Sequence, residues 1–292
     1  MEQWEGKSRG TVLGYKIFIF LLKKVGIGAA YFLLYFVSFY FLIFSTKGSR
    51  ASYNFFKKRL GFSTFKSIAK AYRNTYIFGQ TIIDKVAISS GLRDLFTYDF
   101  DGVDKLNELI EKGEGGVLIS AHVGNFEIAE FFFREIDINS QINIVTTDFE
   151  RNDIKEYLET VTEKNKSKFI FIKEDMSHIF EINKALSSNE LVCFTGDRYL
   201  KNTKFLEEEL VGKKARFPAG PFLLASRLKV PVAFVYVMKE TSTHYHLYTR
   251  IADFKDRDAT GLLKEYVKSV EWILDMYPLQ WFNFFDFWEE MN

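Results

Sequence analysis

The sequence is poor in cysteine, proline and histidine. Its 292 residues include one cysteine, Cys193, four prolines and four histidines. A single cysteine excludes a disulfide framework and any zinc module built on cysteines, and its place in the apolar run 191–194 predicts a buried thiol. With 47% apolar and 26% charged residues the chain has the balance of a folded protein, which excludes a disordered or fibrous class.

Acidic residues are nearly absent from the first 80 positions. This segment holds 13 lysines and arginines but only two acids, Glu2 and Glu5, a net charge of +11, so the remaining residues carry −10. Such an asymmetry predicts a basic segment with an anionic partner, joined to an acidic globular body. Nucleic acid and anionic lipid are the two candidate partners.

Charge is absent from residues 25–44, an aromatic-rich apolar run flanked by Lys23 and Lys24 before it and by Lys47 and Arg50 after it. A helix of that length reaches about 30 Å, the thickness of the hydrocarbon core of a bilayer. Lipid is therefore the expected anionic partner, and nucleic acid is not. A cleaved signal peptide is disfavoured because a long basic stretch precedes the run and no small-residue cleavage site closes it.

The geometry of this anchor stays open at the level of sequence. Tyr31, Tyr35 and Ser38 lie on one weakly polar face of the expected helix, and tyrosine favours the headgroup level. A spanning helix and a helix in the membrane interface both fit. Residues 51–90 continue with apolar positions at helical spacing among lysines and arginines, which predicts one or two basic amphipathic helices.

After Gly102 short apolar runs alternate with helical patterns. Strands are expected at 116–121, 142–147, 168–172, 190–196, 231–238 and 244–251, helices at 103–112, 125–135, 152–163, 177–187, 218–229 and 260–276, and a polar loop at 197–216. Nearly continuous apolar strands between helices predict an α/β fold with a central sheet covered by helices on both faces. We expect two parts: residues 1–50 as a membrane anchor with basic flanks and residues 51–292 as one catalytic domain.

A histidine and a glutamate follow the first apolar strand of that domain at a spacing of five residues, His122 and Glu127. On one continuous helix this spacing separates the side chains by about 140°, so they would not meet. If His122 ends the strand and Glu127 lies in the first turn of the next helix, with Gly124 or Asn125 as cap, they converge. Glu127 would then orient the imidazole, and His122 would serve as a general base. The alternative is an ordinary capping box.

Two later segments at expected strand ends contain an arginine and a tight turn before a helix. Asp197 and Arg198 follow the strand at 190–196, and an arginine there suits an anionic group such as phosphate. Phe217 to Gly220 precede a helix whose first backbone N–H groups would face a phosphate or an oxyanion. Proline at that position is also ordinary helix-start chemistry.

These pieces in this order resemble the lysophospholipid acyltransferase superfamily, and within it the bacterial lipid A biosynthesis acyltransferases that add late, secondary acyl chains. The resemblance rests on the apolar segment 25–44, the H-x4-E motif, Asp197 with Arg198, and the turn at 217–221. It also covers the ending 278–285, a proline, a glutamine and aromatic residues, and so spans nearly the whole chain.

The resemblance implies a mixed, glycerolipid acyltransferase-like sheet and direct acyl transfer from an acyl thioester to a hydroxyl or amine of a glycolipid resembling a lipid A precursor. The catalytic residues would be His122 and Glu127, with no metal and no cofactor, and acyl carrier protein or coenzyme A would bring the acyl group as a co-substrate. The implied location is the cytoplasmic side of a bacterial inner membrane, on an anionic lipid surface. Substrate binding is expected at Asn125, Asp197, Arg198, Phe217 and Gly220.

Two other functions fit parts of the sequence. A non-catalytic lipid-binding or lipid-transfer protein would share the anchor, and mutation of His122 would leave its binding intact. A metal-dependent hydrolase would recruit His122, Glu127 and Asp197 together with His244 and His246, which share one face of an expected strand.

Overall fold

The structure, a computed structural model, describes residues 12–133, 140–146, 167–173, 175–199 and 203–288. It has two compact units: the described residues of 1–96 and 277–292 form the first, and those of 97–148 and 165–276 form the second. The helix expected at 152–163 lies outside the described residues. The division into an anchor at 1–50 and a catalytic domain at 51–292 stays a prediction.

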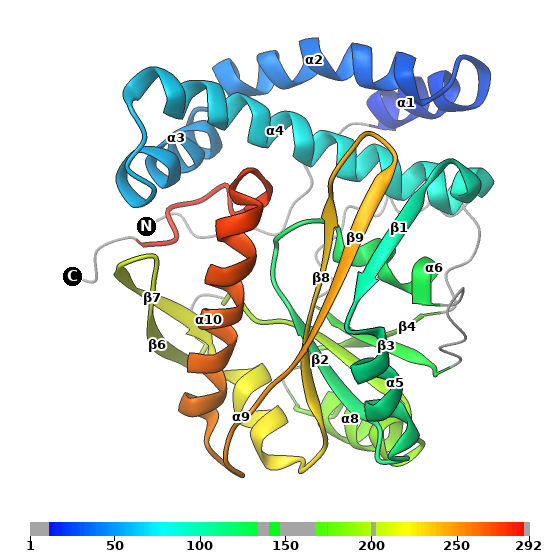
Figure 1. The fold of residues 1–292 in the computed structure, drawn as a ribbon, viewed down its shortest axis with the longest axis vertical. Coiled ribbons are helices and arrows are strands. Elements are labelled where there is room, and N and C mark those ends of the chain that lie inside the picture. Colours follow the sequence, from blue (N-terminus) through cyan, green and yellow to red (C-terminus); the bar gives the residue numbers. More distant parts are fainter. Residues whose placement is uncertain (1–11, 134–139, 147–166, 174, 200–202, 289–292) are drawn as a thin grey trace. The chain divides into compact units, whose positions relative to one another are not determined.

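The first unit is helical (Figure 1). Its elements are α1 (Val12–Lys24), α2 (Ile27–Phe44), α3 (Thr46–Asn54), the π-helical η1 (Phe55–Arg59), α4 (Thr64–Ala87), η2 (Ile88–Leu92), η3 (Arg93–Leu95) and the 3-10 turn η6 (Pro278–Gln280). The apolar run at 25–44 is thus a helix, and by length and composition α2 qualifies as a candidate membrane span. The helix α1 was not expected, because its lysines interrupt the apolar pattern.

A buried amide on α4 joins three segments of the first unit. The side chain of Asn74 donates hydrogen bonds to the carbonyls of Leu279 (2.9 Å) and Trp281 (2.8 Å) and accepts one from the Ser52 hydroxyl of α3 (3.0 Å). The indole of Trp288 stacks on Phe55 with ring centroids 6.0 Å apart. The aromatic end of the chain is therefore part of the core of the N-terminal helices.

The second unit is built on a seven-stranded mixed sheet in the order β1-β9-β8-β2-β5-β3-β4. Its strands are β1 (Thr97–Asp101), β2 (Gly116–Ser120), β3 (Ile142–Thr146), β4 (Lys168–Phe171), β5 (Leu191–Thr195), β8 (Val232–Lys239) and β9 (His244–Ile251). The five strands from β8 to β4 are parallel, whereas β9 runs antiparallel to β8 and parallel to β1.

Helices cover both faces of this sheet (Figure 1). The helices of the unit are α5 (Val103–Glu111), η4 (Phe126–Ile128), α6 (Ala129–Phe133), α8 (His178–Ser187), α9 (Ala219–Arg227) and α10 (Ala259–Met276). Tyr266 of α10 packs on Phe234, while Phe132 of α6 packs on Tyr245, whose side chain points to the opposite face. The predicted α/β fold with a mixed, helix-covered sheet is confirmed.

The prediction of a polar loop at 197–216 is wrong for the residues from 205 onward. Residues Phe205–Leu210 (β6) and Lys213–Pro218 (β7) form an antiparallel hairpin. Glutamates of β6 face basic residues of β7, as in the ion pair of Glu207 with Arg216 at 3.4 Å. The apolar pattern concealed this hairpin because cross-strand charge pairs stabilise an exposed two-stranded sheet with few apolar residues.

Candidate active site

The candidate site lies at the carboxyl ends of two adjacent parallel strands. Ser120 at the end of β2 pairs with Thr195 at the end of β5. Two residues beyond each of these come His122 and Asp197, so the strand register brings the two side chains to the same place. Sites of open α/β sheets form at this edge.

Asp197 holds His122 by two atoms. Its Oδ2 accepts a hydrogen bond from the His122 backbone N–H (2.9 Å), and its Oδ1 lies 2.7 Å from the Nδ1 of the ring. Asp197 is 1% exposed and the His122 side chain 28% exposed. Because an ionised carboxylate only accepts hydrogen bonds, Nδ1 carries the proton in this pair, and Nε2 keeps the lone pair of a base.

A glycine turn carries the chain from His122 toward Glu127. Gly124 has a φ of +67°, and a Cβ at this position would lie 2.2 Å from the carbonyl oxygen of Val237 in β8. The next N–H, of Asn125, donates to that same oxygen at 2.7 Å. Glycine is required here both by the left-handed backbone and by the close approach to β8.

Glu127 lies in the 3-10 turn η4, directly after this loop and exposed, as the spacing predicts. Its carboxylate is close enough to raise the pKa of His122, although Asp197 supplies the hydrogen bond to Nδ1. Asn125 is buried at the position before η4, and its side-chain amide donates to the Tyr245 hydroxyl at 3.4 Å without capping the turn. The structure therefore brings His122, Glu127 and Asp197 into one group.

Burial and a neighbouring cation keep the imidazole neutral. Desolvation by the surrounding protein lowers the pKa of His122 below its ordinary 6.5, and the positive charge of Arg198 lowers it further. Asp197 and Glu127 oppose this shift but do not overcome it. At neutral pH the ring is thus uncharged and able to accept a proton.

Arg198 supplies the positive charge of the site. Its own burial lowers the pKa of the guanidinium to about 10, while Asp197 acts in the opposite direction. The side chain is therefore still cationic at neutral pH, in a poorly solvated place beside His122. A cation of this kind stabilises a negative charge more strongly than one in bulk water.

The other two expected binding residues lie on the hairpin and on the helix that follows it. Phe217 of β7 is fully buried and packs its ring edge-on to Tyr266, so its side chain belongs to the core. Gly220 is the second residue of α9, and a Cβ there would meet no atom within 4 Å. Near it, a cleft of about 410 Å³ is lined by Thr203, Lys204, Phe205, Leu206, Ala219 and Leu223. Their roles in substrate binding stay predictions.

Tyr266 contacts the ends of both strands that carry the site, and the sequence analysis did not identify it. Its hydroxyl donates to the Ser120 carbonyl (3.1 Å), which also accepts from the Gly196 N–H at 2.9 Å. A Cβ on Gly196 would lie 2.9 Å from the tyrosine ring. In the sequence Tyr266 is one of several apolar positions at helical spacing in α10. Only the packing shows that it contacts both strand ends.

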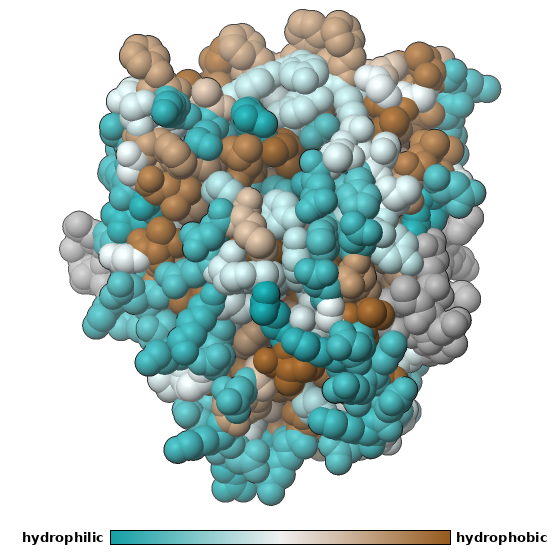
Figure 2. Space-filling model, viewed as in Figure 1, coloured by the Kyte–Doolittle hydropathy of each residue, from teal (hydrophilic) through white to brown (hydrophobic). Residues whose placement is uncertain are grey.

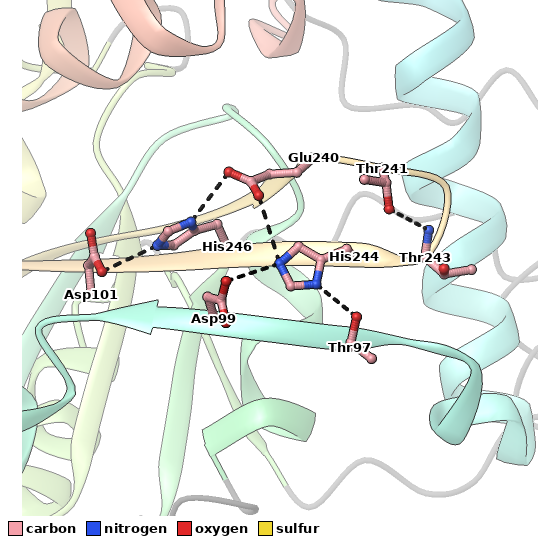
Figure 3. Close-up of polar contacts among 8 residues, drawn as sticks. All are labelled: Thr97, Asp99, Asp101, Glu240, Thr241, Thr243, His244 and His246. Carbon is pink, nitrogen blue, oxygen red and sulfur yellow. Dashed lines mark hydrogen bonds and ion pairs between the residues drawn. The ribbon is translucent and has the colours of Figure 1, made fainter.

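The two histidines of β9 belong to a different cluster, on the sheet face they share with β1 (Figure 3). His244 lies 3.4 Å from Asp99 and 3.7 Å from Glu240, and its Nδ1 is 2.7 Å from the Thr97 hydroxyl. His246 lies 3.4 Å from Asp101 and 3.3 Å from Glu240. Among the described residues, no group of three or more histidine, cysteine, aspartate or glutamate side chains is arranged to bind one metal ion.

A comparison with known protein families assigns most of the chain to one family. Residues 60–290, most of the chain, match the model of a family described as bacterial lipid A biosynthesis acyltransferase. Comparison with curated proteins finds no match. The matched range contains His122, Glu127, Asp197 and Arg198 and indicates acyltransferase activity. The chain belongs to the bacterial lipid A biosynthesis acyltransferase family.

Proposed function

We propose that the protein moves a fatty acyl chain from an acyl thioester to a hydroxyl or amine of a glycolipid that resembles a lipid A precursor. The observation that carries this proposal is the pairing of His122 Nδ1 with buried Asp197 at 2.7 Å, which leaves Nε2 as a base beside the cation Arg198. The family supports acyl transfer and a lipid A type of acceptor. The donor and the roles of single residues are our inference.

His122 starts the reaction as general base. Its Nε2 removes the proton from the acceptor hydroxyl while the acceptor oxygen attacks the thioester carbonyl carbon. The tetrahedral intermediate then collapses, the carbon–sulfur bond breaks, and the thiolate leaves with the proton that the imidazolium returns. No acyl group becomes bound to the protein, and Asp197 stabilises the imidazolium between the two proton transfers.

Arg198 has a role distinct from that of the base. The carbonyl oxygen of the thioester becomes an oxyanion in the intermediate, and the acceptor and donor both carry phosphate. A poorly solvated guanidinium next to His122 suits either negative charge. We assign Arg198 to this charge, with backbone N–H groups near Gly220 as a second candidate donor set.

Glu127 acts through the electrostatics of the ring. Its carboxylate favours the imidazolium, and it follows the turn at Gly124 that β8 fixes in place. In this proposal Asp197 orients His122, and Glu127 assists the developing positive charge. This division of roles differs from the expected pair of His122 with Glu127 alone, because Nδ1 faces Asp197.

The donor is a thioester of acyl carrier protein or of coenzyme A, and neither requires a metal or a resident cofactor. Acyl carrier protein is the expected partner. The exposed cations Lys58 of η1 and Lys66 and Arg73 of α4 would attract the acidic surface of such a carrier protein. The acceptor is a membrane lipid, so we place the protein on the cytoplasmic side of the bacterial inner membrane. The basic N-terminal segment suits the anionic lipid there.

Lipid analysis of cells that lack the gene tests this function. Mass spectrometry is expected to show an underacylated glycolipid, whose structure identifies acceptor and acyl chain together. The wild-type gene restores the missing chain and His122→Ala does not, whereas His178→Ala, a matched change at a histidine of α8, restores it. If His122→Ala restores acylation at the wild-type level, the catalytic assignment is wrong and a lipid-binding role gains support.

A further inference from the structure

The helix α2 buries one side and exposes another. Tyr31, Leu34 and Ser38 are buried, whereas seven large side chains elsewhere around the helix are between 49 and 67% exposed. These seven, which we name the aromatic face of α2, are Phe32, Tyr35, Phe36, Phe39, Tyr40, Ile43 and Phe44. Their spacing of three and four residues makes one continuous stripe, and Figure 2 shows apolar surface over this helix.

The buried side of α2 packs along α4. The Tyr31 hydroxyl donates to the buried carboxylate of Asp84, and a Cβ on Gly79 would lie 2.5 Å from the Leu34 side chain. Tyr35, which is 49% exposed at the edge of the aromatic face, stacks on Tyr76 of α4 with centroids 4.3 Å apart. Residue numbers rise along α2 as they fall along α4, so the two helices run antiparallel, side by side (Figure 1).

This pairing is incompatible with α2 crossing a bilayer. Tyr35 is near the midpoint of α2, and its carbonyl accepts a hydrogen bond from Tyr72 of α4 at 3.2 Å. The next residue of α4, Arg73, is exposed. If α2 spanned the membrane, Arg73 would face lipid near the middle of the hydrocarbon, where a charged side chain is strongly unfavourable.

We propose that α2 lies in the plane of the membrane interface and inserts its aromatic face into one leaflet of anionic phospholipid. Exposed cations stand at both ends of the helix, Lys23 and Lys24 before it and Lys47 and Arg50 after it. An interfacial helix places its aromatic residues among the acyl chains and its basic neighbours among the headgroups. The inference rests on the proposed membrane-bound acceptor and adds the way in which the protein meets that membrane.

The neighbouring helix α1 has the same character. Leu13, Ile17 and Phe20 are exposed at a spacing of four and three residues, and Lys16 is exposed among them. With 13 residues α1 is too short to span a bilayer. A short helix with exposed apolar and basic residues suits the same interface, which supports lipid rather than a second copy of the chain as the occupant of this surface.

Cysteine labelling from the two sides of the membrane tests the geometry. Lys24→Cys and Lys47→Cys place a thiol at each end of α2 in the full-length protein, and the wild type, whose only cysteine is buried, is the control. With a membrane-impermeant maleimide, both variants are expected to react in inverted inner-membrane vesicles and neither in intact spheroplasts. One end labelled from each side would show that α2 spans the membrane and would overturn the proposal.

Vesicle binding tests the aromatic face itself. Phe36→Ser with Phe39→Ser is expected to lower the partition of the purified protein into vesicles of phosphatidylethanolamine and phosphatidylglycerol by about 100-fold, since each buried phenyl ring contributes about tenfold. The matched control is Phe180→Ser, at an exposed phenylalanine of α8, which leaves partition unchanged. If the double variant instead keeps its partition and loses only self-association, a second copy covers the face and the proposal fails.

Acyl transfer in detergent micelles separates this inference from the proposed function. The vesicle-binding variants keep their turnover with micellar acceptor, because they touch no residue of the site at His122. Loss of vesicle binding with full micellar turnover supports both proposals. Absence of turnover in the wild type, together with normal labelling and partition, would contradict the proposed activity and leave the membrane geometry standing.

Discussion

The buried polar side chains of Asn74 and Asp84 in the first unit and of Asp197 in the second have different roles. In the first unit Asn74 and Asp84 bond to neighbouring segments, and each holds helices together. In the second unit the buried carboxylate of Asp197 bonds to one ring, and it leaves the other nitrogen of that ring available to a substrate. Asn74 and Asp84 thus serve packing in the helical, basic unit, whereas Asp197 serves chemistry in the α/β unit, and substitutions of similar size at Asn74 and Asp197 should separate these two roles.

The largest effect is expected for Asp197→Asn. The amide preserves the volume but no longer fixes the Nδ1–H tautomer or stabilises the imidazolium, so kcat should fall by about 10³-fold. Steady-state acyl transfer measures this loss, and vesicle binding reports that the first unit is unaffected. Asp175→Asn, at an exposed aspartate of the same unit, is the control. Retention of a tenth of the activity or more would show that Asp197 is not the orienting group.

Gly124→Ala comes next, because it moves the catalytic loop without removing any catalytic group. The new Cβ would collide with the Val237 carbonyl and would force a residue with a side chain into φ +67°. Turnover should fall by about 100-fold, since displacement of a reacting group by an ångström has an effect of that order. The control is Gly212→Ala, because Gly212 also has a positive φ but an added Cβ would meet no atom within 4 Å. This variant has the backbone strain without the collision. Equal losses in both variants would mean that strain alone is responsible.

A third substitution tests the packing role in the helical unit. Asn74→Leu leaves the carbonyls of Leu279 and Trp281 and the Ser52 hydroxyl without this amide, and the free energy of unfolding should fall by about 2 to 3 kcal/mol. Denaturant unfolding measures the change, with Gln80→Leu on the same helix as control. Intrinsic turnover of the folded fraction should stay the same. A loss of turnover without a loss of stability would remove the contrast between the units.

The smallest effect is a shift in pH dependence. Arg198 lowers the pKa of His122 and Glu127 raises it, so the acidic limb of kcat/KM should move to higher pH in Arg198→Gln and to lower pH in Glu127→Gln. The wild-type limb should lie below pH 6.5 because the net shift of the His122 pKa is downward. Arg227→Gln, an exposed arginine of α9, should leave the limb in place. Shifts in the same direction for both variants would contradict the electrostatic assignment.

The pattern of the sequence predicted the parts of the fold that bury apolar faces. The strands β2, β5 and β8 and the helix α10 appear where continuous or helically spaced apolar residues stand. The edge strand β1 was missed because charged residues alternate along it, and the β6–β7 hairpin because runs of charged residues interrupt its apolar pattern. Apolar periodicity reports burial, and exposed strands that depend on pairing carry little of it.

For the site, local spacing predicted less than the strand register shows. The H-x4-E motif located His122 and Glu127, but the partner of Nδ1 lies 75 residues away in the sequence. Its position follows from the pairing of Ser120 with Thr195, which no single segment reveals. Tyr266 is hidden for the same reason, because its contact with the Ser120 carbonyl depends on how α10 packs.

Because Asp197 binds both the backbone and the ring of His122, the variant His122→Ala is useful for crystallography. Oδ2 accepts from the backbone N–H rather than from the ring, so this bond survives when the imidazole is removed. His122→Ala should therefore keep the loop and its strand end in the wild-type arrangement while the proton transfer is lost. Such a protein suits the capture of donor and acceptor together in an unreacted complex, in which the density of the two lipids would reveal acyl length and acceptor directly.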